Sequence, residues 1–189
     1  MNKAFVKEDD TWEDPEIELD PEADIPAGSR NYMTPQGADR LREELHDLVR
    51  QQRPQLLDSI NRMGRDGLDS ADTKFREARK SLQHLEKRVA FLTGRLAITE
   101  VIDPAAQDSE HIRFGATVTV EPSSGPEKIY RIVGIDEADI NQGLISWTSP
   151  LARSLLDGKA GDVVRVSAPA GEQELEIIEV RYIDIENSS

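Results

Sequence analysis

The clearest periodic pattern in the chain is a heptad seam in its central part. Apolar residues recur at alternating intervals of three and four positions, at Phe75, Ala78, Leu82, Leu85, Val89, Leu92 and Leu96. This spacing places them on one face of an α-helix and is typical of a coiled coil. A helix over roughly residues 72–97 would be about 40 Å long, because an α-helix rises ~1.5 Å per residue.

A second apolar helical face precedes this seam. Its residues are spaced mostly by three, four or multiples of four, at Leu41, Leu45, Leu48, Leu56, Ile60 and Met63. They predict a helix that ends near Gly64. Thr34 is a good N-cap and Pro35 suits the first helical position. Pro54 lies inside this helix and cannot donate a backbone hydrogen bond, so we expect a kink there.

The short segment between the two helices, residues 65–72, predicts the tip of an antiparallel hairpin. Asp66 and Gly67 favour a turn, because glycine tolerates positive φ and aspartate bonds its own backbone. The carboxylates of Asp66, Asp69 and Asp72 fall within seven residues. A turn does not need three acids, so they serve either chemistry or helix capping. Under the capping interpretation, Asp69 is the N-cap and Asp72 is the third helical residue.

The chain changes character after residue 103. Residues 104–111 are polar and predict a linker, and five short strands follow, at 116–120, 129–135, 144–147, 163–168 and 174–183. Turn-forming residues at 123–126 and 170–171 fit hairpins between these strands. Ser149 and Pro150 predict the start of a short helix, filled by residues 151–156 and ended by Gly158.

These elements predict an α+β fold with two parts. Residues 31–103 would form an antiparallel coiled-coil hairpin, and residues 112–189 would form a small β-rich domain with one short helix. Neither helical face has enough apolar surface for a globular core. We therefore expect the hairpin to project and either to dock on a partner or to deliver its tip to one.

Composition narrows the function classes. The net charge is −14, from 37 acidic and 23 basic residues, which argues against non-specific binding of nucleic acid or membranes by the whole surface. The absence of cysteine excludes disulfides and thiolate chemistry, and three scattered histidines make a zinc site improbable. No apolar run approaches the ~20 residues of a membrane span, and no signal core is present at the start. We expect a soluble, cytoplasmic protein.

Residues 1–30 form an acidic tail. Between Glu8 and Asp24 there are ten acids, no base and two of the tail's three prolines. Few apolar groups are available to offset the entropy of ordering such a segment, so we expect disorder. The tail is either a solvated extension or a recognition segment in which Phe5 and Trp12 dock on a partner.

The second helix is rich in bases. It carries seven of them against three acids, and Arg76, Arg79 and Lys80 share one face. This stripe is either a solvated face with routine i,i+4 ion pairs or a surface that lies beside a nucleic-acid backbone.

Several segments carry a family resemblance. In the first half they are residues 31–37, the Arg53-Pro54 pair, the Ala71-Asp72 pair and residues 88–96; in the second half they are residues 114–118, 130–134, 149–153 and 161–164. Over about residues 30–183 the chain resembles the bacterial transcript-cleavage factors of the Gre family, closer to the GreB-like branch. The resemblance implies an FKBP-like C-terminal domain that binds RNA polymerase at the rim of its secondary channel.

Further roles follow from this resemblance alone. Ser149, Pro150 and Leu151 would belong to the loop that contacts polymerase, although the same residues also suit a well-capped helix start. The coiled coil of a monomeric factor would enter the secondary channel. Arg76, Arg79 and Lys80 would then approach the 3′ end of the nascent RNA.

The family's usual tip reads Gly-Asp-x-Ser-Glu-Asn-Ala followed by an acid. Asp66 matches the first acid, and Asp69 replaces the glutamate with a side chain one methylene shorter. The resemblance implies that Asp66 and Asp69 help to hold a second Mg²⁺ in the polymerase active site and orient the attacking water. Polymerase would then cleave backtracked RNA.

Three functions remain open. The chain is a cleavage-stimulating elongation factor, a regulator that occupies the channel without stimulating cleavage, or an unrelated coiled-coil adaptor. In none of them is it an enzyme by itself, because the reactive metal would belong to the polymerase and no cofactor is expected on the chain alone.

Overall fold

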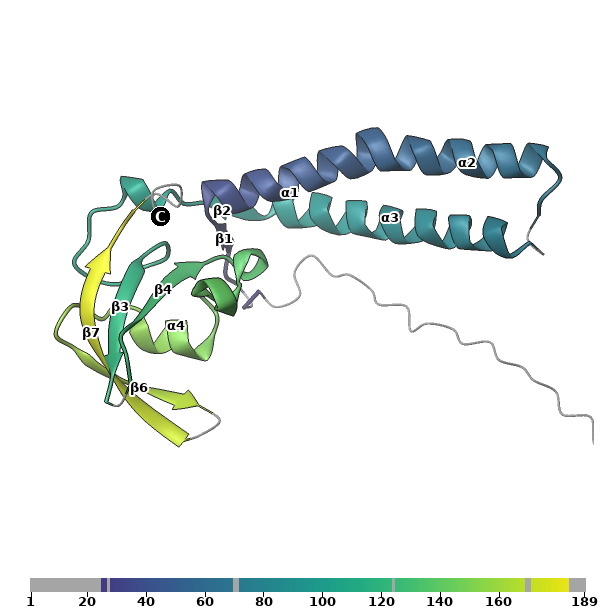
Figure 1. Cartoon of the computed structure of the whole chain (residues 1–189). Coiled ribbons are helices and arrows are strands. Elements are labelled where there is room, and N and C mark those ends of the chain that lie inside the picture. Colours follow the sequence, from purple (N-terminus) through teal and green to yellow (C-terminus); the bar gives the residue numbers. More distant parts are fainter. Residues whose placement is uncertain (1–24, 27, 70–71, 124, 169–170, 184–189) are drawn as a thin grey trace, which may run out of the picture.

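The computed structural model describes residues 25–26, 28–69, 72–123, 125–168 and 171–183. A long helical hairpin projects from a small mixed α/β domain (Figure 1). The predicted α+β class with its hairpin is therefore confirmed. The acidic segment that precedes Ile25 lies outside the described residues. Within the described part of the chain, no helix has the length and apolar character needed to cross a membrane.

The first arm of the hairpin consists of α1 (Pro35–Asp47), a π-helical segment (Leu48–Gln52) and α2 (Arg53–Arg65). Thr34 caps it as predicted, because its side chain accepts a hydrogen bond from the Gly37 N–H. We expected a kink at Pro54, and the structure has the π-helical segment just before it, ending at Gln52. A wider turn relieves the clash between the proline ring and the preceding carbonyl groups.

The second arm is α3 (Thr73–Ala97), which runs antiparallel to the first. The buried side chains gather at the base of the hairpin, where they form one apolar cluster of Met33, Ala38, Leu41, Leu48, Leu85 and Leu92. No residue of α2 is buried, so the outer half of the hairpin is exposed on most of its surface. An ion pair of 2.7 Å between Arg53 Nε and Glu86 Oε1 connects the two arms there.

Two short strands close the base of the hairpin. β1 (Asn31–Met33) and β2 (Thr99–Val101) pair in parallel, and the Ile102 N–H donates to the Met33 carbonyl oxygen at 2.9 Å. The sequence patterns did not predict these strands. They tie the start of the first arm to the end of the second.

The C-terminal sheet has the order β5-β4-β3-β7-β6. Its strands are β3 (Thr117–Pro122), β4 (Lys128–Val133), β5 (Leu144–Ser146), β6 (Val163–Ala168) and β7 (Gly171–Arg181). All pairs are antiparallel except β4 with β5. Each of the five predicted strands occurs, with ends shifted by up to three residues. Helix α4 (Pro150–Leu155) lies against the sheet, and its Ala152 and Leu155 enter the main core.

One local expectation in this half was wrong. Helix α4 ends at Leu155, and the residue with left-handed backbone is Asp157, with φ 65°, rather than Gly158. Gly158 is needed for close packing instead, because a Cβ there would lie 2.8 Å from Ile177 Cδ1. The predicted linker contains a short 3₁₀ helix (Pro104–Ala106), and Pro104 is buried. The segment therefore packs against the domain that follows.

Candidate functional site

The tip of the hairpin exposes two of its three carboxylates. Asp66 ends α2, where its N–H donates to the Arg62 carbonyl oxygen at 3.0 Å, and Gly67 follows with φ 85°. The predicted Asp66-Gly67 turn is thus confirmed. The side chains of Asp66 and Asp69 are both exposed. Within the described ranges, no three acidic, histidine or cysteine side chains gather into a metal site.

Asp72 is the N-cap of α3. Its Oδ1 accepts hydrogen bonds from the N–H of Lys74 at 2.8 Å and of Phe75 at 3.2 Å. Its backbone has the extended conformation that an N-cap requires, with φ −79° and ψ 128°. The interpretation that places Asp69 at the cap and Asp72 inside the helix is therefore wrong. Asp72 takes the N-cap position instead, and Asp69 is exposed at the tip.

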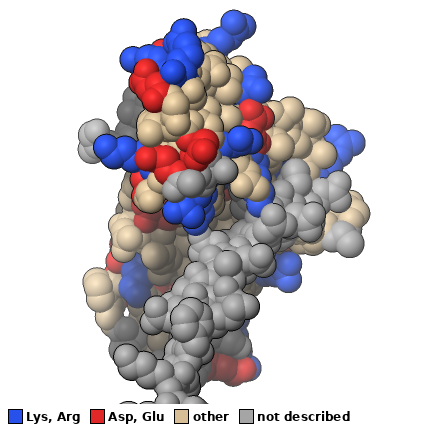
Figure 2. Space-filling view, turned by 90° about the vertical axis from the view of Figure 1, so that its right-hand side faces the viewer, with Lys and Arg blue, Asp and Glu red and all other residues tan. Residues whose placement is uncertain are grey.

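The three predicted basic residues share one surface below the tip. Arg76, Arg79 and Lys80 line an open groove along α3, together with Leu82, Gln83 and Glu86. Arg79 places its guanidinium 5.9 Å from the ring centroid of Phe75, and Arg76 Nη2 donates to Thr73 Oγ1 at 3.4 Å. Figure 2 views the molecule from the tip end, where acidic and basic side chains are both exposed. We call the groove lined by Arg76, Arg79 and Lys80 the basic groove.

The predicted docking loop begins helix α4. Ser149 Oγ accepts a hydrogen bond of 3.2 Å from the Ala152 N–H, so this hydroxyl serves as the N-cap. Pro150 is exposed at the first helical position, and Leu151 packs against the domain core. Beside the loop lies an apolar groove whose lining includes Tyr130, Leu144 and Leu175.

The rim of this apolar groove is exposed. Ile140 lines it and is 68% exposed, and Lys128 lies on the same rim. Exposed apolar surface next to polar residues is typical of protein-binding sites. Pro150 and Leu151 therefore belong to a surface suited to docking, whereas Ser149 shapes the helix start.

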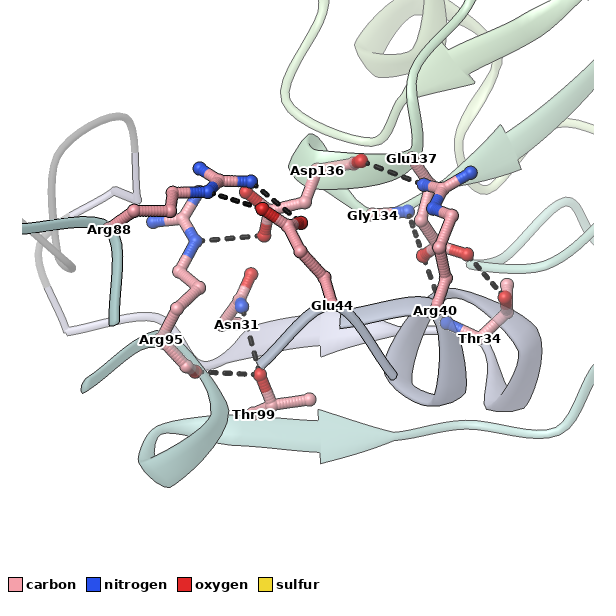
Figure 3. Close-up of polar contacts among 10 residues, drawn as sticks. All are labelled: Asn31, Thr34, Arg40, Glu44, Arg88, Arg95, Thr99, Gly134, Asp136 and Glu137. Carbon is pink, nitrogen blue, oxygen red and sulfur yellow. Dashed lines mark hydrogen bonds and ion pairs between the residues drawn. The ribbon is translucent and has the colours of Figure 1, made fainter. Parts of the chain in front are cut away.

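Sequence reasoning missed a polar cluster where the hairpin meets the C-terminal domain (Figure 3). Glu137 is buried, and its Oε2 accepts hydrogen bonds from the N–H of Thr34 at 3.0 Å and of Gly134 at 2.9 Å. The Thr34 hydroxyl donates to its other oxygen. A Cβ at residue 37 would lie 2.2 Å from Glu137 Cδ, so only glycine fits there. The helix cap of α1 is therefore also the attachment point of the other domain.

A second contact in this cluster joins α3 to the same 3₁₀ turn (Ile135–Glu137). Arg95 is only 2% exposed, and its Nε lies 2.8 Å from Asp136 Oδ2. Arg40 Nη2 donates to the Asp136 carbonyl oxygen at 2.9 Å. We call Thr34, Arg40, Arg95, Asp136 and Glu137 the joint, because they connect both arms of the hairpin to the C-terminal domain.

An ion pair next to the joint holds the two arms together. Both Arg88 nitrogens Nε and Nη2 donate to the Glu44 carboxylate, at 2.7 and 2.9 Å (Figure 3). Hydrogen bonding to Glu44 raises the pKa of Arg88 above its ordinary value, although partial burial opposes this shift. The Arg88 guanidinium therefore stays charged at any physiological pH.

Comparison with known families matches both parts of the chain. The model "Transcription elongation factor, N-terminal" matches residues 31–101, and the model "Transcription elongation factor, GreA/GreB, C-term" matches residues 107–182. Together they cover more than half of the chain.

Individual relatives agree with these models. The chain is 44% identical over 156 residues to the transcription elongation factor GreA of Alkalilimnicola ehrlichii, which covers 82% of this chain and 99% of the relative. It is 38% identical over 159 residues to GreB of Neisseria meningitidis serogroup A, covering 84% and 98%. The solved structure of GreA factor homolog 1 (Gfh1) of Thermus thermophilus covers 81% of this chain and 99% of its own at 22% identity, with a TM-score of 0.38. Since GreA and GreB proteins both match, the expected GreB-like branch is not resolved.

Proposed function

Because the chain belongs to the GreA/GreB family of transcription elongation factors, we propose that it binds RNA polymerase in the cytoplasm as a single copy. Its hairpin enters the secondary channel and stimulates cleavage of backtracked nascent RNA, so that elongation resumes. The observation that carries this proposal is the pair of exposed carboxylates, Asp66 and Asp69, at the far end of a 25-residue helix. Such a helix spans about 37 Å, which is long enough to carry a tip away from the docked domain.

The tip suits a shared magnesium ion. Mg²⁺ prefers oxygen ligands and commonly takes only one or two protein carboxylates while keeping several waters. Asp66 and Asp69 would supply these carboxylates, and the remaining ligands would come from the polymerase. Bound there, a second Mg²⁺ would supply an activated water for in-line attack on the RNA. This chain then acts as an accessory factor, since its own residues offer only part of a metal site.

The basic groove suits the RNA that leaves the active site. Arg76 lies four residues beyond the cap Asp72, so the groove begins about 6 Å below the tip along α3. Cations at this place would neutralise phosphates of the extruded 3′ segment. Tip and groove would then orient the same RNA strand.

The apolar groove beside Pro150 suits the contact with polymerase outside the channel. Its position on the C-terminal domain leaves the hairpin free to project. The joint then sets the direction in which the hairpin leaves the docked domain.

A second function is favoured by one observation at the tip. Asp69 has a shorter side chain than the glutamate of the family's usual pattern, and Leu68 stands where serine is usual. Because metal ligation is sensitive to shifts of about 1 Å, the alternative is a regulator that occupies the channel without stimulating cleavage.

The deciding experiment measures release of short 3′ RNA fragments from a stalled polymerase complex across a magnesium titration. Wild type should accelerate release, and Asp66→Asn should lower this acceleration about 100-fold while polymerase affinity stays within about twofold. Asp58→Asn is the matched control, because Asp58 is exposed on α2 and pairs with Arg62 at 3.2 Å, outside the tip. Asp69→Glu should preserve or raise the rate.

Two outcomes separate the candidates. If wild type releases no more RNA than polymerase alone at any magnesium concentration, while Asp69→Glu does, the regulator is the correct function. If neither the wild type nor Asp69→Glu binds polymerase, the cleavage factor and the regulator are both refuted.

A further inference from the structure

The acidic tail precedes the part of the chain that the family models match. Both family models begin at or after residue 31, and the 156 residues aligned with the GreA relative cover 99% of that protein. The difference, 189 − 156, leaves about 33 residues of this chain outside the alignment. Residues 8–24 contain ten acids and no base. Residues 8–24 therefore carry a dense negative charge outside the ranges that the family models match.

The complementary surface lies on the hairpin. Between residues 50 and 88 the chain has ten bases and six acids, inside a protein of net charge −14. At the basic groove, neither Arg76 nor Arg79 has an acidic partner within 4 Å among the residues that the structure describes. By contrast, Arg53, Arg62 and Arg88 are all paired with carboxylates. Arg76 and Arg79 thus place two positive charges without a carboxylate partner among the described residues on one exposed face.

We propose that residues 8–24 bind in the basic groove of the same molecule in the free protein. The carboxylates of the tail would then occupy the place of RNA phosphates, and RNA would displace them. The contact between tail and groove is inferred from the chain's own charges. Its displacement by RNA rests on the function proposed above. The contact would regulate the groove by limiting adventitious binding of nucleic acid before polymerase is engaged.

The tail is long enough for this contact. Arg79 lies 18 residues before Ala97, the last residue of α3, which places it about 27 Å from the base of the hairpin. An extended chain spans about 3.3 Å per residue, so ~9 residues before Asn31 already reach Arg79. Acids from about residue 22 backwards can therefore lie along the groove. The prolines at positions 15, 21 and 26 favour such extended backbone.

The contact can be tested without polymerase. A zero-length carbodiimide joins a lysine amine to a carboxylate only where the two touch, and mass spectrometry identifies the linked peptides. In the full-length protein at low salt, Lys80 in the groove should link to acids of residues 8–24. Lys128 and Lys159, which are exposed on the C-terminal domain, are the matched control amines. Raising the salt to about 0.5 M should lower the Lys80 links about fivefold, because surface charges are then screened.

A double variant tests the groove itself. Arg76→Gln with Arg79→Gln removes two charges and keeps Lys80, the amine whose links are measured. The yield of links between Lys80 and the tail should therefore fall about fivefold. Both side chains are exposed, and circular dichroism checks that helix content is unchanged. Replacing the ten acids by Asn and Gln should increase binding of a single-stranded RNA oligonucleotide to the free protein.

Three results would overturn the proposal. The first is that Lys80 links to the tail no more often than Lys128 or Lys159. The second is that the links in a mixture of ¹⁵N-labelled and unlabelled protein form between molecules rather than within them. The third is that the double variant leaves the yield unchanged. A cleavage assay that fails, with Lys80 links intact, would instead refute the function proposed above and leave the tail contact standing.

Discussion

Substituting Glu137 by glutamine should show how firmly the joint holds the hairpin. The carboxylate accepts three hydrogen bonds, from two backbone N–H groups and from the Thr34 hydroxyl. Glutamine keeps the size of the side chain but has one acceptor oxygen, and its NH₂ group must face a donor. Losing a hydrogen bond to a buried charged group costs about 1.5–3 kcal/mol. With at least one such bond lost, the free energy of unfolding should fall by about 2–3 kcal/mol.

Glu137→Gln should also displace the tip, because a small rotation of the hairpin at the joint becomes a larger movement at its far end. From Arg95 in the joint to Thr73 at the start of α3 there are 22 residues, or about 33 Å. A rotation of about 5° at the base would then move the tip by about 3 Å, whereas metal ligation is sensitive to about 1 Å. Glu137→Gln should therefore lower the stimulation of RNA cleavage at least about tenfold. Polymerase affinity should change little, because the groove beside Pro150 is not part of the joint.

Urea unfolding followed by circular dichroism measures the first effect, and fragment release from a stalled complex measures the second. Glu86→Gln is the matched control, because Glu86 pairs with Arg53 at 2.7 Å with both side chains nearly half exposed. Exposed ion pairs contribute about 0.2–1 kcal/mol, so this variant should lose less than about 1 kcal/mol. If Glu137→Gln destabilises no more than Glu86→Gln, the joint does not fix the hairpin as we infer.

Three further predictions concern single elements. Pro150→Arg should weaken polymerase binding by about tenfold or more at unchanged melting temperature, and unchanged affinity would remove this loop from the interface. Asp72→Ala should lower the free energy of unfolding by about 1 kcal/mol and Asp72→Asn by much less, as urea titrations can resolve; equal losses would contradict the capping role. Hydrogen bonding to Arg181 holds the pKa of Glu179 below its ordinary value, so this carboxylate stabilises the fold at neutral pH and loses its effect as pH falls through that lowered pKa. Arg181→Gln should raise the Glu179 pKa in a carbon-13 NMR titration, and no change would refute the pairing.

Local patterns predicted the elements of this protein well. The heptad seam from Phe75 to Leu96 lies in one continuous helix, and the caps Thr34 and Ser149 are those of the structure. These features depend on neighbouring residues, whose spacing the sequence displays directly. The α+β division followed from the same patterns.

The contacts that orient the two parts could not be predicted in this way. Thr34 and Glu137 are 103 residues apart, and strands β1 and β2 have three residues each. Such short strands have no measurable periodicity, and a single glutamate after a strand has the same appearance as a solvated surface acid. Gly37 carried the only local signal, because a glycine in the first turn of a helix is unfavourable unless another group needs the space.

The wrong capping assignment at the tip has a consequence for function. Both Asp69 and Asp72 are good N-cap residues, and only the extended backbone at Asp72 selects between them. Because Asp72 accepts the N–H groups of Lys74 and Phe75, it supplies the N-cap of α3 in place of Asp69. We therefore expect Asp69 variants to keep this cap intact. The usual glutamate of the family can be restored at this position without disturbing the cap, so Asp69→Glu compares the two acidic side chains at the tip while Asp72 still caps α3.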